Sequence, residues 1–350
     1  SRVKIMSITI DEMLDLLSFA GTERANGNAN HGPMAAEALF TLDRGESVLP
    51  WVEKYKTGLI EGPEAANPIP HSEWREFLGD RSRLGDWIAF FDQELAEKSW
   101  QETLREWVPP LAPAVMAAAT HGLLRTSHAI RNLSALETPQ RLHELAQGLG
   151  YWAARYQVLP GSPSPTNGGF SPSSAIAQVD RLHGPEFEGS GSIQQQIMGL
   201  DEQPEFAPAI DLVDAGGDLS AFISSLTETF AGLYLANQKN LIAFVHTVTA
   251  PSSLRTLAPY LAEADARLAA LYAWQACAGI YSWYSVVPPM DTTGLEAPSE
   301  DREDLIDRAV AAGGAHSIKF TEACLREYTI NPNPVYLVAA RDAPERVGPI

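Results

Sequence analysis

Apolar residues recur at helical spacing along nearly the whole chain, and this pattern constrains the fold more than any other feature. Alternation of apolar and polar residues, which would indicate half-buried strands, is scarce. No short repeat is visible, which argues against a solenoid. The sequence therefore predicts an all-α protein with one large, helical, bundle-like domain over residues 1–350. The runs with helical period are 9–20, 32–45, 86–108, 114–136, 138–159, 219–250, 263–285 and 301–328.

Local signals at the ends of several runs agree with helices. Thr9 precedes an apolar run and Glu12 follows three residues later, which is the spacing of a capping box. Thr138 is a good N-cap for the run that follows it. Pro33 falls in the first turn of its run and Gly45 just past its end, where these two residue types are favoured.

Residues 160–205 interrupt the helical pattern with a long stretch rich in Pro, Gly and Ser. Connections of this length are uncommon inside compact domains, and those that occur are often active-site lids or plain linkers. Both interpretations stay open: a lid over a pocket, or a flexible surface connection.

The formal net charge of −19 limits the partners that the protein can have. Nucleic acids and anionic membranes are bound through basic patches, so we expect neither as a partner. No stretch reaches the roughly 18 apolar residues that a membrane span requires, and the N-terminal residues lack the apolar run of a signal peptide. The two cysteines, Cys277 and Cys324, lie in apolar helical runs and indicate reduced core residues of a cytoplasmic protein.

Motifs for common cofactor sites and catalytic centres are absent. The chain has neither a GxxxxGK[ST] loop nor a GxGxxG between a strand and a helix, so a P-loop or Rossmann nucleotide site is not indicated. It also lacks a GxSxG elbow, an HExxH pair and a CxxC pair. A conventional zinc site is therefore not indicated either.

Half of the eight histidines lie in apolar, helix-like surroundings: His31, His121, His246 and His316. They come from four separated segments of an all-α chain. Helix bundles build metal sites from side chains that project inward from facing helices, and neutral imidazole is the commonest metal ligand in proteins. One interpretation is a shared metal site in the core. The other is that each is an ordinary core histidine with its own hydrogen bonds.

A lysine accompanies the last of these histidines. His316 and Lys319 are three residues apart and would share one face of a helix that otherwise carries Ala, Ile, Phe and Cys types. A cation is costly to bury on such a face, and burial lowers the pKa of a lysine. Alternatively, Lys319 extends its amine to solvent or pairs with Glu322 on the next turn.

His128 lies two helical turns after His121, which corresponds to an axial rise of about 10.5 Å. At that separation the two side chains are poorly placed to bind the same ion. We assign His128 and Arg125 as the candidate catalytic or substrate-facing residues. Packing in the core is the alternative for His128, and pairing with a helix-surface carboxylate is the alternative for Arg125. The remaining histidines lie in polar surroundings at the surface or in loops: His71, His143 and His183.

Four motifs in this order resemble the questin oxidase-like family: NHGPMAAEAL at 30–39, THGLLRTSHAIR at 120–131, FVHTVT at 244–249 and HSIKFTEA at 316–323. The resemblance extends from about residue 12 to residue 330. Characterised relatives of this type are fungal enzymes that oxygenate anthraquinones and related aromatic polyketides. Those enzymes open a ring in a reaction often described as Baeyer–Villiger-like.

The resemblance also implies a mononuclear non-haem iron held by four histidines and by a carbamate that a lysine forms with CO2. The matching residues in this chain are His31, His121, His246, His316 and Lys319. The second motif of the fungal relatives is closer to H-P-L-I-H. Here Gly122 replaces the proline and Arg125 stands in place of the second histidine, a departure that bears on the substrate more than on the metal.

The resulting hypothesis is an iron-dependent oxygenase that uses O2 to cleave a ring of a polycyclic, anthraquinone-like substrate, with an external reductant if one is needed. Aromatic residues of the run 263–285 would line its pocket, unless they belong to the helix core: Trp274, Tyr281, Trp283 and Tyr284. The rival hypothesis is a helical small-molecule-binding protein with a structural metal or none. A closed coordination sphere would favour the rival, and an open position would favour catalysis.

Overall fold

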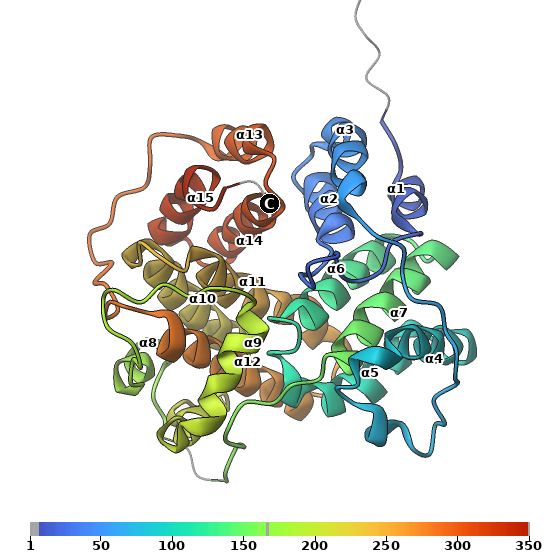
Figure 1. The fold of residues 1–350 in the computed structure, drawn as a ribbon. Coiled ribbons are helices and arrows are strands. Elements are labelled where there is room, and N and C mark those ends of the chain that lie inside the picture. The colour runs from blue at the N-terminus through green and yellow to red at the C-terminus, as the bar shows by residue number, and fades with distance from the viewer. Residues whose placement is uncertain (1–6, 166–167, 349–350) are drawn as a thin grey trace, which may run out of the picture.

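The computed structural model describes residues 7–165 and 168–348 (Figure 1). Within these ranges every regular element is a helix, and β pairing is limited to isolated bridges. The prediction of an all-α protein is therefore confirmed. The α-helices are α1 (Ile10–Leu17), α2 (Gly32–Thr41), α3 (Gly45–Tyr55), α4 (Leu84–Glu97), α5 (Trp100–Leu111), α6 (His121–Ala135), α7 (Pro139–Ala154), α8 (Pro172–Ala175), α9 (Ile193–Ile197), α10 (Leu219–Ala236), α11 (Leu241–Leu257), α12 (Glu263–Tyr284), α13 (Arg302–Ala312), α14 (Ala315–Ile330) and α15 (Pro334–Arg346). The 3-10 helices are η1 (Lys56–Gly58), η2 (Trp74–Phe77), η3 (Arg81–Arg83), η4 (Ala112–Ala114), η5 (Ile176–Gln178), η6 (Met198–Glu202), η7 (Pro204–Leu212) and η8 (Ala258–Tyr260).

Several predicted helix boundaries are found in the structure. The Thr9 hydroxyl accepts from the backbone N–H of Glu12, and the Glu12 carboxylate accepts from the backbone N–H of Thr9, which completes the capping box of α1. Thr138 caps α7 by accepting a backbone N–H of its first turn. Gly45 was expected just past the end of the second predicted helix. In the structure α2 ends earlier, at Thr41, and Gly45 is the first residue of α3.

Four of the runs with helical period are broken in the structure, and two of these breaks contain left-handed residues other than glycine. The run 219–250 is divided into α10 and α11, and Asn240 before α11 has a left-handed backbone with a φ of 61°. In the run 114–136, Ala118, Ala119 and Thr120 are left-handed, with φ values of 51°, 53° and 71°, and α6 begins only at His121. Such backbone angles cost a residue other than glycine roughly 1–3 kcal/mol, so the surrounding structure must impose them. Both breaks lie beside the cavity described below.

Four helices form a closed ring in the middle of the protein (Figure 1). Helix α2 packs on α6, α6 on α11, α11 on α14, and α14 back on α2. Outside this ring, α7 covers α6 and α4 covers α7, while α10 and α12 pack on α11 and α15 packs on α14. The ring thereby brings together segments that are far apart in the sequence.

Most of the buried apolar side chains of the described residues form one continuous cluster, from Met13 in α1 to Ala343 in α15. This cluster surrounds the ring of α2, α6, α11 and α14 and extends into the helices that cover it. The assignment of residues 1–350 to a single domain stays a prediction, and residues 1–6 and 349–350 lie outside the described residues.

The stretch 160–205, apart from residues 166–167, which lie outside the described residues, contains α8, η5, α9, η6 and the beginning of η7. Its first part packs against the covering helices: Gln275 on α12 donates to the carbonyls of Pro160 and Gly161 at 3.0 and 2.9 Å, and α8 packs on α10. Its later part, residues 188–196, contributes to the wall of the cavity. The lid interpretation therefore applies to the later part and stays a prediction.

Helix α10 is, among the described helices, the one that is long and apolar enough to cross a membrane by length and composition alone. Half of this helix is buried inside the protein, where α11, α12 and α15 pack against it. Core helices of globular proteins commonly meet the same criterion, so this helix is weak evidence for a membrane span.

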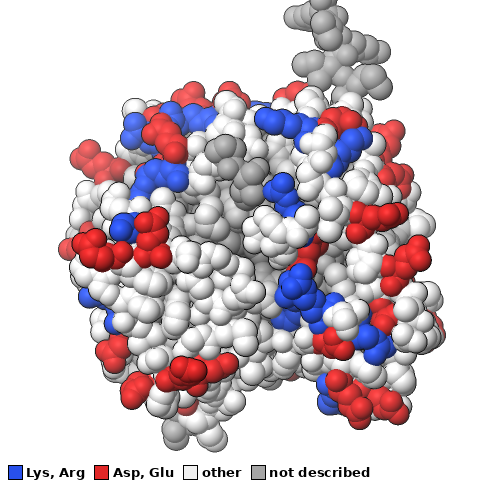
Figure 2. All heavy atoms as spheres, viewed as in Figure 1, with Lys and Arg blue, Asp and Glu red and all other residues white. Residues whose placement is uncertain are grey.

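The acidic excess is not gathered into one patch on the face shown in Figure 2. Asp and Glu side chains lie mainly around the periphery of this face and are mixed with Lys and Arg. The region over α9 and α12 is largely uncharged. This uncharged region lies next to the cavity, because α9 and the end of α12 form part of the cavity wall.

Candidate metal centre

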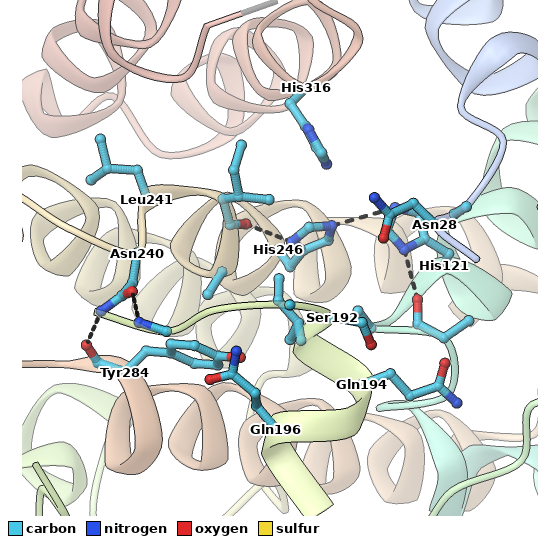
Figure 3. A pocket seen from close by; sticks show the side chains of 18 of the residues that line it. Asn28, His121, Ser192, Gln194, Gln196, Asn240, Leu241, His246, Tyr284 and His316 are labelled. Carbon is cyan, nitrogen blue, oxygen red and sulfur yellow. Dashed lines mark hydrogen bonds between the residues drawn. The ribbon is translucent and has the colours of Figure 1, made fainter. Parts of the chain in front are cut away.

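Each helix of the central ring contributes one histidine to a buried cluster. His31 is the N-cap of α2, His121 is the first residue of α6, His246 lies within α11 and His316 is the second residue of α14. All four residues are 5% exposed or less. Figure 3 shows His121, His246 and His316 pointing toward one another from their separate helices. We call these four residues the histidine cluster.

The imidazole rings follow one another in the same order as the helices. Ring centroids are 4.7 Å apart for His31 and His121, 4.8 Å for His121 and His246, 5.2 Å for His246 and His316, and 4.4 Å for His316 and His31. Metal–nitrogen bonds of about 2.0–2.1 Å place two ligands of one ion at most about 4 Å apart. The 3.4 Å between Nε2 of His121 and Nε2 of His246 lies within that range. Ring nitrogens of His31, His121 and His316 lie within 4.8 Å of one another, which a small side-chain movement would close.

Hydrogen bonds fix the tautomers of two members of the cluster. Nδ1 of His121 lies 2.7 Å from the carbonyl oxygen of Ala118, and Nδ1 of His246 lies 2.6 Å from that of Ile242. Because a carbonyl oxygen only accepts, each Nδ1 carries the hydrogen and each Nε2 carries a lone pair. Two lone pairs facing each other at 3.4 Å cannot form a hydrogen bond. A cation between them would satisfy both.

Other nitrogens of the cluster also lack a partner. Nδ1 of His31 and both ring nitrogens of His316 are buried without a hydrogen bond to any described residue. Burial lowers the pKa of all four histidines, and the nearby charge of Lys319 lowers them further; the pKa of His246 falls to about 3. At neutral pH the cluster is therefore neutral imidazole, the form that binds metals such as iron, zinc, copper and nickel.

Lys319 lies one helical turn after His316 and is only 3% exposed. Burial lowers the pKa of its amine to about 7, and among the described residues no carboxylate lies near enough to raise it again. Its positive charge lowers the pKa of every histidine of the cluster, so the amine is close to all four. Neither alternative from the sequence is seen, since Lys319 is buried and Glu322 instead accepts from Arg131 and Arg326 at 3.0 Å each.

A second buried group lies further along the same helices, and we call it the ionic frame: Glu37, His128, Arg131, Glu322 and Arg326. The carboxylate of Glu37 accepts from Nδ1 of His128 at 2.5 Å and from Nε of Arg131 at 3.0 Å. Arg131 also donates to Glu322, and Arg326 donates both to Glu322 and to the Ser252 carbonyl on α11. The ionic frame thus connects α2, α6, α11 and α14, the four helices that carry the histidine cluster.

The two candidate catalytic residues do not line the cavity next to the cluster. His128 belongs to the ionic frame. Arg125 donates from Nε and Nη2 to the two carboxylate oxygens of Glu144, at 2.7 and 2.9 Å, in a buried bidentate pair between α6 and α7. It also lines a separate cavity of about 250 Å³ with His143. The structure gives both residues packing partners, which spacing along α6 could not reveal because the partners come from other helices.

A cavity of about 490 Å³ opens on all four histidines (Figure 3). Its volume falls within the about 300–1,000 Å³ that is usual for small-molecule sites. The walls come from the chain before α2, the beginning of α11, the segment 188–196 and the end of α12. Side-chain amides and a hydroxyl are prominent in these walls: Asn28, Ser192, Gln194, Gln196, Gln238 and Asn240. The cavity therefore offers many hydrogen-bonding groups of no net charge.

Of the four aromatic residues predicted to line a pocket, the structure places Tyr284 in the cavity wall. Trp274 is fully buried and donates to a backbone carbonyl at 2.8 Å, Tyr281 lies beside an arginine, and Trp283 packs edge-on against His183 with ring centroids 4.8 Å apart. The helical period shows the apolar face of α12. It does not show which part of that face meets a cavity and which part meets a neighbouring helix.

The sequence analysis did not single out the polar cavity residues at 238–240 or in the segment 188–196. A signal was available for the first group, because the letters QKN interrupt two apolar runs and such an interruption is typical of a turn between helices. In the second group, Ser192 caps α9 by accepting from the backbone N–H of Gln195 at 3.1 Å. The surrounding Gly- and Ser-rich letters carry no period from which a position could be derived.

The remaining histidines lie apart from the cluster and do not line its cavity. His71 is exposed beside two glutamates, His143 pairs with an aspartate at 2.9 Å, and His183 stacks on Phe187 with ring centroids 3.8 Å apart. The spacing of His71 and its two glutamates would admit a metal ion. Lys98, however, already donates to both of these carboxylates.

A protein-family model described as Questin oxidase-like matches residues 30–324 of the chain. A comparison of the chain with curated proteins found no match. The matched range begins just before His31 and ends just after Lys319, so it contains the whole histidine cluster and the lysine beside it. The resemblance seen in the four sequence motifs is thereby confirmed.

Proposed function

Because the chain belongs to the questin oxidase-like family, we propose that it is a non-haem iron oxygenase acting on a polycyclic aromatic polyketide. Membership itself implies an oxidoreductase with a polyketide-like small molecule as substrate. Iron, O2 as the oxidant and Baeyer–Villiger-like ring cleavage are the parts that we add. Insertion of one oxygen atom of O2 leaves the other to become water, and an external reductant has to supply the two electrons and two protons for it.

The observation that carries this proposal is the pair of Nε2 atoms of His121 and His246, 3.4 Å apart, each without a hydrogen because the hydrogen of each ring lies on Nδ1. Buried acceptors in an ordinary core find donors. His31 and His316 bring further nitrogens without protein partners to the same place. These four histidines would hold the iron, which when bound supplies the redox chemistry that O2 needs to react with a closed-shell ring.

Lys319 would complete the donor set as a carbamate. With a pKa lowered to about 7 by burial, much of the amine is neutral near pH 7. The amine lone pair attacks the carbon of CO2, so that an N–C bond forms, one C=O π bond opens and the nitrogen releases a proton. The resulting anion replaces a cation, which would repel a metal, with an oxygen donor that resembles a carboxylate.

The cavity favours catalysis over the rival hypothesis of a binding protein with a structural metal. Structural metal sites are closed by protein ligands, whereas catalytic sites keep a position open to substrate. Here all four histidines line one cavity of about 490 Å³. The amide-rich walls would orient an oxygenated substrate against the cluster and displace water from it.

Elemental analysis combined with oxygen uptake tests the proposal. We expect stoichiometric iron in the chain after reconstitution, and O2 consumption that requires iron, an anthraquinone and a reductant such as ascorbate. The matched control is His143→Ala, which removes a half-exposed histidine outside the cluster and should leave both measurements unchanged. Bound zinc with no O2 uptake under any of these conditions would favour the binding protein. A chain that takes up no metal at all would contradict the metal centre itself.

A further inference from the structure

Tyr284 is the last residue of α12, is 3% exposed, and lines the cavity onto which the histidine cluster opens. Figure 3 shows it on the same side of the cavity as Gln196 and Asn240. Among the described residues its hydroxyl has no hydrogen-bond partner, although it is buried. Tyr151, the other tyrosine in the cavity wall, differs in this respect because its hydroxyl donates to a carboxylate oxygen of Glu23 at 3.0 Å.

Tyr284 is held in place by two other segments of the chain. A Cβ on Gly189 would lie 2.6 Å from Cε1 of Tyr284, so the backbone of Gly189 packs directly on the ring. The Gly189 N–H donates to the side-chain oxygen of Asn240 at 2.9 Å, and the Asn240 side-chain N–H donates to the Tyr284 carbonyl at 3.1 Å. The segment at Gly189 therefore packs on the ring while Asn240 holds the backbone of Tyr284, and a fixed hydroxyl loses little freedom when it binds a partner.

Burial raises the pKa of the Tyr284 phenol, so the hydroxyl stays protonated at neutral pH and can donate a hydrogen bond. A buried donor without a partner is unfavourable, and a site built around such a donor selects ligands that offer an acceptor. A ring carbonyl is a suitable acceptor because its oxygen accepts only and is held rigidly in the plane of the ring system.

We propose that Tyr284 is a specificity-determining residue that donates a hydrogen bond to a carbonyl oxygen of the polycyclic substrate. The polycyclic frame of that substrate rests on the proposed function, whereas the choice of a carbonyl-bearing ligand rests on the unpartnered hydroxyl itself. Ligands of equal shape without the carbonyl leave the donor unsatisfied and bind more weakly. The residue thereby selects for the oxidation state of the ring system and not only for its shape.

Calorimetric titration of the purified full-length chain with two matched probes tests this role. The probes are anthraquinone-2-sulfonate and anthracene-2-sulfonate, which share a three-ring frame and an anionic group but differ in the two ring carbonyls. The variant is Tyr284→Phe, which removes only the hydroxyl. The matched control is Tyr281→Phe on the same helix, since Tyr281 lies outside the cavity wall.

For the wild type we expect the quinone probe to bind more tightly than the anthracene probe. Tyr284→Phe should weaken the quinone probe about five- to tenfold, as expected for one neutral hydrogen bond, and leave the anthracene probe within about twofold. Tyr281→Phe should change neither. Equal weakening of both probes by Tyr284→Phe, or no weakening of either, would overturn the inference while leaving the proposed function intact. A wild-type chain that binds neither probe would instead overturn the polycyclic substrate class, and the inference with it.

Discussion

The histidine cluster and the ionic frame are carried by the same four helices, yet their polar groups are in opposite states. In the ionic frame, Glu37 accepts from His128, Arg131 and Thr41, and Glu322 accepts from two arginines. In the cluster, nitrogens of all four imidazoles lack a hydrogen-bond donor or acceptor among the described residues. Buried polar groups normally find partners within the protein. The histidine cluster is therefore the region that needs a partner from outside the protein. The ionic frame, whose groups are satisfied, holds together the four helices that carry the histidine cluster.

Two histidines of α6 make the same contrast within one helix. His121 and His128 are both buried, at 5% and 8% exposure. His121 donates to a backbone carbonyl and turns a lone pair toward His246, which is the arrangement of a metal-binding histidine. His128 donates to the carboxylate of Glu37 and is part of an ion-pair network. The partners of the two rings, and not their burial, distinguish the two roles.

The largest effect should come from Lys319→Arg. The variant keeps a positive charge beside the cluster, but guanidinium stays protonated and cannot form a carbamate. We expect loss of bound metal and a fall in oxygen uptake of roughly a hundredfold or more, the upper end of losses seen when metal sites are disturbed. Lys319→Ala should be partly restored by formate or acetate, which can fill the oxygen position. Wild-type metal content in Lys319→Arg would show that Lys319 is an ordinary cation.

The pair His121→Ala and His128→Ala tests the contrast within α6 directly. His121→Ala should lose most of the bound metal, because it removes a ligand. His128→Ala should keep the metal but lower the free energy of unfolding by about 1–3 kcal/mol, because Glu37 loses one of its donors. Metal content and urea denaturation of the two variants provide the comparison. Equal metal loss in both would mean that the ionic frame is itself part of the metal site.

Glu37→Ala should destabilise the fold without abolishing metal binding. It leaves the buried guanidinium of Arg131 with one carboxylate fewer, and breaking a buried ion pair in this way typically costs about 3–5 kcal/mol. Glu303→Ala, which removes an exposed partner of Arg44, is the matched control and should leave the urea midpoint nearly unchanged. If both variants shift the midpoint equally, the ionic frame does not hold the helices in the way described.

The two regions should lose stability in different pH windows. Burial keeps the folded-state pKa of each cluster histidine below 6.5, so the unfolded chain binds more protons. Their stabilisation is complete above pH 6.5 and is lost as the pH falls, for His246 toward about 3. Burial disfavours the charged forms of Glu37 and Glu322, but their arginine partners outweigh it and hold both pKa values below 4.5. Their stabilisation is therefore present above pH 4.5 and lost below it.

Urea denaturation of the metal-free chain between pH 7 and pH 3 measures these windows. His316→Phe should flatten the pH dependence of the free energy of unfolding from pH 6.5 downward, so that its effect begins above the window of the carboxylates. Glu37→Gln should flatten it only below pH 4.5. The two windows would not exist as separate features if both variants altered the same part of the curve.

The smallest effect should come from histidines outside both regions. His71→Ala and His143→Ala remove side chains that are exposed or half-exposed and do not line the cavity. Metal content, oxygen uptake and the urea midpoint should stay close to those of the wild type. A loss of metal in either variant would indicate that histidine number, and not position in the ring of helices, governs metal binding.

Much of the fold could be predicted from local patterns. The helical period predicted an all-α chain, and the capping box of Thr9 and the cap of Thr138 begin helices where expected. The break at residues 118–120 could not be predicted, because the letters around it continue an apolar helical pattern, whereas the polar letters NQKN at 237–240 were an available signal for the turn before α11. Tertiary contacts impose those breaks, and both of them open onto the cavity.

The sequence by itself determined which side chains the helices present and at what spacing: four histidines in apolar segments, with Lys319 one turn after the last. Only the tertiary structure decided how those side chains are used. It brought His31, His121, His246 and His316 into one cluster, directed Arg125 to Glu144, and placed Tyr284 but not Trp274 in the cavity wall. The physical reason is that helical period depends on neighbours three and four residues away along the chain, whereas the partner of a buried polar group comes from whichever helix packs opposite it.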